Sequence, residues 1–322
     1  RPMDFMAPWV VDPLVDRFGL VYDITDFSEI VSVLRRSGSG ALDDSFRKMF
    51  RFQRRINRMA KAHRMTLEKY LGDGAFYSSR HAVAMTTAAI QIQRFYKQEL
   101  EEDFPFDRGL RIALNHGQYR LIPIGRDGPE QGERYEFFGH GLVELSRLTT
   151  GKGAKEIDEI KMLLISYGYP EGAVHRFFAP LIASDVDVVD HQEEARPFRA
   201  YINSNGNLVN EGIVTTGAFL SRLDRESSWQ RLYLGRAGDR IYVALPLADA
   251  AGEILVGVRR LGRARFKGLD PVEVYELIDG ADLEGLEEML DESLDTAMQK
   301  LPPPGLGGRR AHVDLSDPRL AG

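Results

Sequence analysis

The chain has 322 residues, of which 43% are hydrophobic and 28% are charged, as expected for a globular protein with one large domain or two small ones. Its formal net charge of −6 argues against a general nucleic-acid-binding protein. The absence of cysteine excludes disulfides, zinc–thiolate sites and cysteine nucleophiles, and we expect a cytoplasmic protein. No apolar run in the sequence is long enough to span a bilayer.

The first predicted strand is a short apolar run at residues 20–22, which suits a buried central position. Apolar residues then recur at the i, i+3, i+4, i+7 spacing of one helix face, at Phe27, Ile30, Val31 and Leu34. We therefore expect a helix that Thr25 or Asp26 caps, with Asp23 at the strand end just before it. The N–H groups of a helix start attract anions such as phosphate, although Asp23 alone is equally consistent with a cap or a surface charge.

A long helix is predicted from about residue 42 to residue 63, with a dense basic face that we interpret as solvated. Residues 65–77 then predict two strands joined by a tight turn, because Gly72-Asp73-Gly74 has Asp-Gly turn chemistry. Most such pairs are turns and nothing more. Asp23 favours a metal-binding role for Asp73, because two carboxylates at neighbouring strand ends would suit two divalent metals that bind a triphosphate.

The rest of the chain predicts an α+β fold with a mostly antiparallel sheet covered by helices. The predicted elements are a helix at 80–100, strands at 109–115 and 119–124 with a turn at His116, and strands at 232–234, 241–245, 254–258 and 272–275. We assign residues 1–280 to one catalytic domain, with an insertion of unknown role at about 151–228. Residues 281–322 are interpreted as an acidic helix followed by a flexible tail.

Five segments, in this order, resemble the class III nucleotidyl cyclases, the family of adenylate and guanylate cyclase catalytic domains. They are residues 23–28 (Asp-Ile-Thr-Asp-Phe-Ser), 69–73 (Lys-Tyr-Leu-Gly-Asp), 112–117, 135–147 and 266–277. The resemblance covers roughly residues 18–150 and 240–278. It implies a ferredoxin-like βαββαβ core and an enzyme that converts a nucleoside triphosphate to a 3′,5′-cyclic nucleotide and pyrophosphate.

The resemblance also assigns roles to the residues that handle metal and phosphate. Asp23, Asp73 and the Ile24 carbonyl would hold two Mg²⁺ or Mn²⁺ ions. Arg147 would steady charge on the phosphoryl group in the transition state, and Lys267 would hold the departing phosphates. In the family the aspartates and the arginine of one site come from different subunits, so a homodimer with sites at its interface is implied.

A second group of residues would bind the nucleoside. By resemblance, Lys69 and Glu136 read the base, and Phe27 belongs to the nucleotide-binding set. By analogy with the family, a lysine and an acid favour adenine, because the lysine can donate to the ring nitrogen N1 and the acid can accept from the amino group. Cytosine presents a similar acceptor and amino group, and guanine and uracil also remain possible bases. The chain departs from the family at Val143, where a transition-state asparagine is expected and valine cannot donate a hydrogen bond.

Two alternatives to an active cyclase therefore stay open. Val143 and the large insertion suggest a degenerate cyclase domain that senses a nucleotide or docks a partner without turnover. Residues 23–27 and 71–74 also resemble the metal segments of the diguanylate cyclases, whose second segment has the form Gly-Gly-Asp-Glu-Phe. Leu71 and Gly74 break that form, so this reading ranks last.

Overall fold

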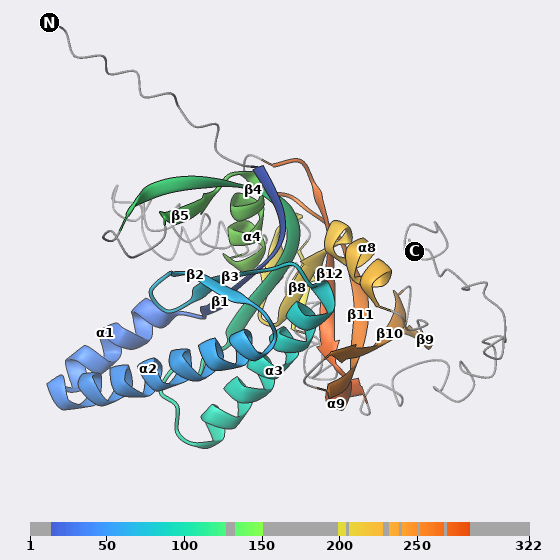
Figure 1. The fold of residues 1–322 in the computed structure, drawn as a ribbon. Helices are drawn as coiled ribbons and strands as arrows, with labels where there is room; N and C mark the ends of the chain where they lie inside the picture. The colour runs from blue at the N-terminus through green and yellow to red at the C-terminus, as the bar shows by residue number, and fades with distance from the viewer. Residues whose placement is uncertain are drawn as a thin grey trace, which may run out of the picture.

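The structure is a computed structural model that describes residues 14–126, 133–150, 199–203, 206–227, 232–237, 240–249, 252–266 and 269–283. Helices pack on a large, mostly antiparallel sheet (Figure 1), which confirms the predicted α+β class. Within the described ranges no helix combines the length and the apolar character needed to cross a membrane.

The N-terminal half of the described chain forms a ferredoxin-like unit. Its elements, in chain order, are β1 (Leu14–Ile24), α1 (Phe27–Ser37), α2 (Ser39–Ala62), β2 (Thr66–Tyr70), β3 (Ala75–Ser79), α3 (Ala82–Glu101) and β4 (Leu110–Arg126). The strands stand side by side in the order β2-β3-β1-β4, and each neighbouring pair is antiparallel. The predicted βαββαβ core is confirmed, with α1 and α2 together occupying the place of its first helix.

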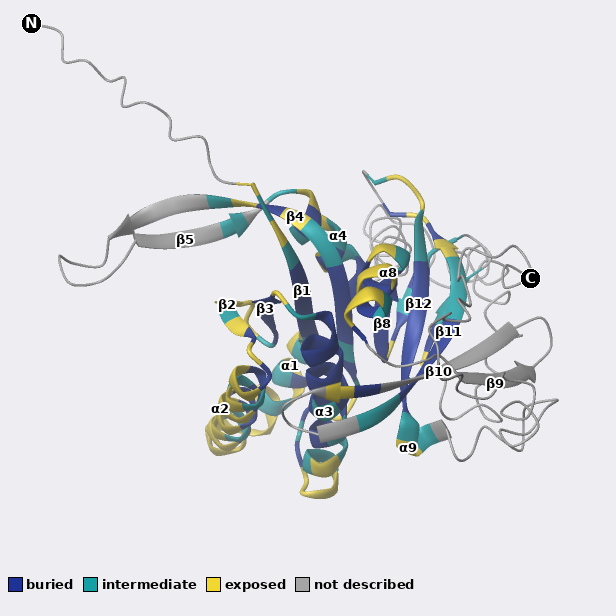
Figure 2. Cartoon of the chain, turned by 45° about the vertical axis from the view of Figure 1, so that its right-hand side comes forward, coloured by how far each residue is buried: buried dark blue, intermediate teal, exposed yellow. Residues whose placement is uncertain are grey.

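Strand β1 separates two hydrophobic clusters because successive side chains of a strand point to opposite faces of the sheet. Tyr22 belongs to the cluster that includes α2 and α3, whereas Val21 packs in the cluster that includes Leu145 of α4 (His140–Thr150). Figure 2 shows β1 and most of α3 buried, while the outer surface of α2 is exposed. Asp23, two residues after Val21, is therefore directed to the face that α4 covers.

Strand β4 is continuous, so the prediction of two strands separated by a turn at His116 was wrong. β1 pairs with β4 along its whole length, from Leu14 opposite Arg120 to Ile24 opposite Leu110. His116 lies inside this pairing, with its ring centroid 4.9 Å from that of Phe18. The polar residues that suggested a turn instead form backbone hydrogen bonds with β1, and such pairing overrides local turn propensity.

The C-terminal half extends the sheet beyond β4. Its further elements are β5 (Glu133–Phe138), β6 (Ala200–Ile202), β7 (Leu208–Asn210), β8 (Ile213–Thr216), α8 (Gly217–Glu226), β9 (Leu232–Ala237), β10 (Arg240–Asp249), β11 (Gly252–Ala264), β12 (Val272–Asp279) and α9 (Gly280–Leu283). β8 lies parallel to β4 and antiparallel to β12, and β11, β10 and β9 follow outward in that order. The four strands predicted between residues 232 and 275 are confirmed as β9 to β12.

Part of the expected insertion belongs to this central architecture. Between residues 199 and 227, the described part of that segment supplies β8 to the middle of the sheet. It also supplies α8, whose Glu226 accepts a hydrogen bond from the Ala82 N–H at the start of α3. Residues 151–198 of the expected insertion lie outside the described residues, as do residues 284–322 of the expected acidic helix and tail.

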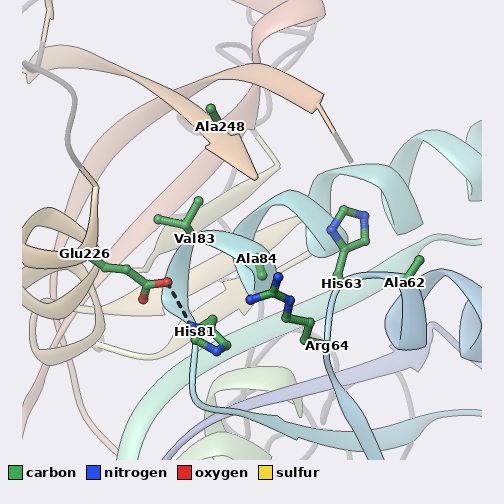
Figure 3. Close-up of a pocket in the computed structure, with 8 residues that line it drawn as sticks. All are labelled: Ala62, His63, Arg64, His81, Val83, Ala84, Glu226 and Ala248. Carbon is green, nitrogen blue, oxygen red and sulfur yellow. Dashed lines mark ion pairs between the residues drawn. The ribbon is translucent and has the colours of Figure 1, made fainter. Parts of the chain in front are cut away.

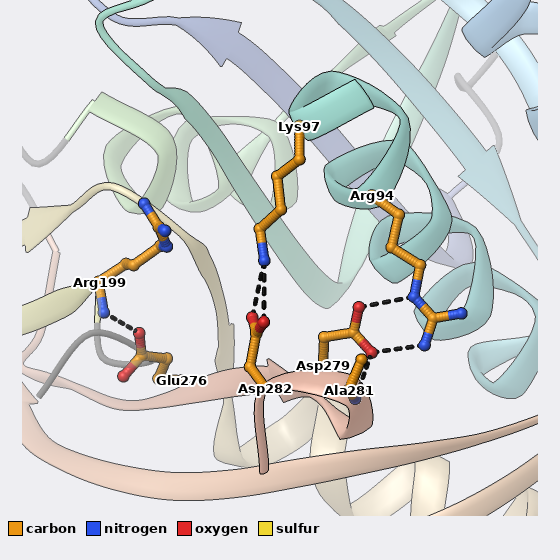
Figure 4. Close-up of polar contacts among 7 residues, drawn as sticks. All are labelled: Arg94, Lys97, Arg199, Glu276, Asp279, Ala281 and Asp282. Carbon is orange, nitrogen blue, oxygen red and sulfur yellow. Dashed lines mark hydrogen bonds and ion pairs between the residues drawn. The ribbon is translucent and has the colours of Figure 1, made fainter. Parts of the chain in front are cut away.

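Two ion pairs tie α3 to the end of β12 and to α9 (Figure 4). Arg94 donates from Nε and Nη2 to the two carboxylate oxygens of Asp279, at 2.6 and 2.5 Å. Lys97 donates to Asp282, at 2.8 Å to its nearer oxygen. The Asp279 side chain is 2% exposed and that of Asp282 is 30% exposed. Helix α3 therefore links the ferredoxin-like unit to the C-terminal strands.

Candidate functional site

The end of β1 holds Asp23 at a fixed position. Asp23 is half-buried and precedes Ile24, the last residue of the strand, whose side chain is buried. The Thr25 N–H donates to the Gly109 carbonyl at 3.0 Å and closes the strand end. The expected side-chain cap on α1 is absent: Asp26, at the N-cap position, makes no capping bond and instead lies 3.4 Å from Arg108. The Thr25 hydroxyl has no partner among the described residues.

The β2–β3 hairpin brings Asp73 to this same strand end. Ala75 pairs with Tyr22, and a Cβ on Gly74 would lie 2.0 Å from the Tyr22 carbonyl oxygen and 3.2 Å from the Asp23 Cα. Because no other residue type could approach so closely, Gly74 lets the turn sit directly against β1. The half-buried Asp73, its immediate neighbour in the chain, therefore lies in the turn that packs against this strand end.

Two further contacts support this position of the turn. The buried Gln53 side chain of α2 donates from Nε2 to the Gly72 carbonyl at 2.8 Å, so the turn is held from the helix side. Burial raises the pKa of Tyr22 well above its usual value, and the neighbouring Tyr77 and Tyr70 phenols and the Asp73 carboxylate raise that pKa further.

A cavity of about 350 Å³ opens beside these residues. Its walls come from β1, the β2–β3 hairpin, β5 and α4, and they consist of Val21, Asp23, Glu68, Lys69, Leu71, Phe76, Phe137, Leu142, Ser146, Thr149 and Thr150. Asp23, which the resemblance assigns to metal binding, and Lys69, which it assigns to the base, both line this cavity. A concave, largely apolar cavity with a few convergent charged groups is the usual form of a small-molecule site.

Close packing of glycines holds α4 against the sheet and so fixes the wall of the cavity. A Cβ on Gly117 would lie 2.9 Å from the Gly141 Cα. The buried Asn115 side chain donates to the Gly141 carbonyl at 2.8 Å and to Glu144 at 3.0 Å, and it accepts from the Tyr119 hydroxyl at 2.6 Å. Sequence reasoning did not single out this network, and its only sequence signal is the polar Asn115 within a strand.

The other predicted site residues lie away from the cavity lining or outside the described side chains. Arg147 lies on α4 next to Ser146, but it does not line the cavity of its own chain. Phe27 packs against Phe106, with ring centroids 5.0 Å apart, and so belongs to the core of the α1 side. The backbone of Glu136 lies in β5 opposite Ile122, whereas its side chain and all of Lys267 lie outside what the structure describes.

The donor set at the end of β1 fits a hard divalent cation. Two carboxylates and a backbone carbonyl are oxygen ligands of the kind that Mg²⁺ and Mn²⁺ prefer. Among the described residues no group of three or more His, Cys, Asp or Glu forms a complete cage.

A second cavity, of about 190 Å³, lies between α3, α8 and the end of α2 (Figure 3). It is lined in part by His63, Arg64, His81 and Glu226. The Glu226 carboxylate lies 3.5 Å from His81 Nδ1 and accepts the Ala82 N–H, so its charge is already committed to the start of α3. None of the sequence-predicted site residues lines this cavity.

No protein-family model and no curated protein matches the sequence. Solved structures of similar fold include class III cyclase domains. The adenylyl cyclase CyaB from P. aeruginosa is 14% identical with a TM-score of 0.47, over 83% of this chain and 97% of that chain. For the guanylyl cyclase Cya2 the identity is 12% and the TM-score 0.44, over 83% and 93%. For the guanylate cyclase domain of RhGC from Catenaria anguillulae in complex with GTP they are 11% and 0.42, over 82% and 95%.

These likenesses concern the overall fold. Asp23 and Lys69 line one cavity beside the end of β1, and Gly74 packs the turn that carries Asp73 against the same strand end.

Proposed function

We propose that this chain is a nucleotidyl cyclase that converts a ribonucleoside triphosphate, preferably ATP, to the 3′,5′-cyclic nucleotide and pyrophosphate. The observation that carries the proposal is the position of Gly74 against Tyr22 and Asp23, which brings Asp73 to the end of β1. The cavity shared by Asp23 and Lys69 supports it. The five sequence segments that resemble the class III nucleotidyl cyclases, in the same order along the chain, also support this chemistry.

Asp23, Asp73 and the Ile24 carbonyl would hold two divalent ions. Bound there, Mg²⁺ or Mn²⁺ would lower the pKa of the 3′-hydroxyl and neutralise the triphosphate. The 3′-oxygen attacks the α-phosphorus in line, the bond from that phosphorus to the bridging oxygen of the β-phosphate breaks, and pyrophosphate leaves. The hydroxyl proton passes to solvent. The protein's task is positioning and charge stabilisation, with no covalent intermediate.

The remaining residues are assigned by what each side chain can offer. Lys69, exposed at the cavity, would donate to the base, and Glu136 would accept from it. Arg147 and Lys267 would bind the phosphates, the arginine through its planar fork of donors. Since Arg147 does not line the cavity of its own chain, we propose that it serves the site of a second subunit in a homodimer.

A nucleotide-binding module without turnover is the second candidate. The observation that favours it is Val143, which is 43% exposed on α4 one turn before Arg147. A valine there cannot donate to the phosphoryl oxygens, and loss of one such donor costs on the order of 3 kcal/mol in an activation barrier. Such a loss lowers the rate roughly 100-fold and leaves binding intact.

Incubation of the protein with each of the four ribonucleoside triphosphates and Mn²⁺ separates these readings. Release of pyrophosphate with a 3′,5′-cyclic mononucleotide, lost in Asp73→Ala, supports the cyclase. Nucleotide binding without product supports the binding module. A linear or cyclic dinucleotide would instead place the chain with the diguanylate cyclases. An Asp43→Ala variant, which removes an exposed carboxylate of α2, controls for a general effect of charge.

A further inference from the structure

Strand β2 contains an irregularity that the sequence does not reveal. Leu67 pairs with Tyr77 of β3 and Lys69 pairs with Phe76, so Glu68 is an extra residue without a partner across the hairpin. Such a bulge re-aims side chains that would otherwise alternate between the two faces. Glu68 and Lys69, although consecutive, both line the cavity that contains Asp23. The bulge therefore puts an acid and a base side by side in one small space.

The Glu68 carboxylate is held in a defined orientation. The buried Ser78 of β3 donates from Oγ to Glu68 Oε1 at 2.5 Å, and within the described chain Oε2 has no hydrogen-bond partner. Burial raises the pKa of Glu68, while the Ser78 bond and the Arg17 charge lower it. A partly buried carboxylate with one anchored oxygen and one open oxygen is suited to accept a hydrogen bond from a ligand.

We propose that Glu68 is a specificity-determining residue that accepts a hydrogen bond from the exocyclic amino group of the bound base. The proposal rests on the proposed function, because it places the base in the cavity lined by Lys69. An ionised carboxylate only accepts hydrogen bonds and an ammonium only donates them. Together they match an edge with an amino donor beside a ring-nitrogen acceptor, which adenine and cytosine present. Guanine and uracil carry a carbonyl oxygen in place of that amino group.

The experiment compares two ligands that differ only in the amino group. They are the α,β-methylene analogues of ATP and of purine riboside triphosphate, which cannot release pyrophosphate and share the same ring acceptor. Their affinities with Mg²⁺ are measured by calorimetry. In the wild type we expect the amino-bearing analogue to bind about tenfold more tightly, the value of one hydrogen bond to a charged group. In Glu68→Gln, whose side chain is isosteric, we expect the preference to fall below about threefold.

Three further variants make the result specific to Glu68. Glu101→Gln removes an exposed carboxylate at the end of α3 and should keep the full preference. Ser78→Ala removes the anchor of Oε1 and should weaken the preference partially; it decides the matter if Glu68→Gln does not fold, as judged by thermal unfolding. Glu136→Gln tests the acid that the sequence resemblance assigns to the base. If Glu136→Gln abolishes the preference while Glu68→Gln keeps it, the proposal is overturned.

Failure of the proposed function gives a different result. If the wild type binds neither analogue, the nucleotide site itself is absent and the role of Glu68 is lost with it. If the wild type binds both analogues equally, or Glu68→Gln keeps the tenfold preference, nucleotide binding stands and the role of Glu68 is refuted.

Discussion

Gly74 lies against the backbone of Tyr22 so closely that a Cβ at Gly74 would be 2.0 Å from the Tyr22 carbonyl oxygen. Real side chains do not tolerate such an approach, and the Tyr22 carbonyl belongs to the backbone of a central strand, which cannot shift without a large cost in free energy. This one contact fixes how near the hairpin turn comes to β1. It therefore sets the separation of the two carboxylates on which the proposed chemistry depends.

Substitution of Gly74 by alanine should separate Asp73 from Asp23. The added methyl group pushes the turn away from β1, and a misplacement of about 1 Å at a reacting centre can lower a rate about 100-fold. We expect a loss of that size in pyrophosphate release. The matched control is Gly40→Ala in α2, where a Cβ meets nothing within 4 Å and helix propensity improves. Equal activity of the two variants would contradict the proposed site.

Mixing two inactive variants tests whether Arg147 acts across a dimer. Asp73→Ala and Arg147→Ala should each be inactive alone. If subunits exchange at random, half of the dimers are mixed, and each mixed dimer has one site with both substitutions and one site with neither. The mixture should therefore regain about a quarter of the wild-type activity. No recovery, despite demonstrated subunit exchange, would mean that both residues of a site come from one chain.

Periodicity in the sequence was enough to predict the elements that frame the site. The apolar spacing from Phe27 to Leu34 predicted α1, and the Gly-Asp-Gly turn predicted the β2–β3 hairpin, because both are local signals. The unbroken β4 was not predicted, since its polar centre around His116 is stabilised by pairing with β1, residues far away in the chain. Register between distant strands leaves little trace in a local pattern.

In the candidate site, too, local sequence motifs predicted some residues, whereas others depend on contacts between segments that are distant in the chain. Asp23 and Lys69 could be proposed from motifs, and the structure places both at one cavity. Glu68 could not, because its direction depends on a bulge that exists only through the pairing of β2 with β3. Asn115 was also missed, since its bonds to Gly141 and Tyr119 depend on how α4 packs on the sheet.

The two carboxylates that bind α3 should differ in their contribution to stability. Asp279 is 2% exposed and accepts two hydrogen bonds from Arg94, so Asp279→Ala should lower the free energy of unfolding by about 2 kcal/mol. Asp282 is 30% exposed and pairs with Lys97 in contact with solvent, so Asp282→Ala should cost about 0.5 kcal/mol. Urea denaturation of both variants measures the difference. Equal losses would show that burial of Asp279 adds nothing to its ion pair.

Replacement of Glu68 by glutamine should change stability in a pH-dependent way. Burial is the main cause that raises the pKa of Glu68, so the ionised form is less favourable in the folded protein than in the unfolded chain. Below about pH 4 the carboxyl group is protonated in both states and carries no penalty. As the pH rises through the unfolded and then the folded pKa, the folded state must lose a proton that it holds more tightly, and stability falls. Glutamine removes this penalty.

The melting temperature of Glu68→Gln relative to wild type should therefore increase from about pH 4 to about pH 7. The exposed Glu101→Gln variant controls for general charge effects, and a difference that is constant or that decreases with pH would show that the Glu68 carboxylate is not buried as the structure has it.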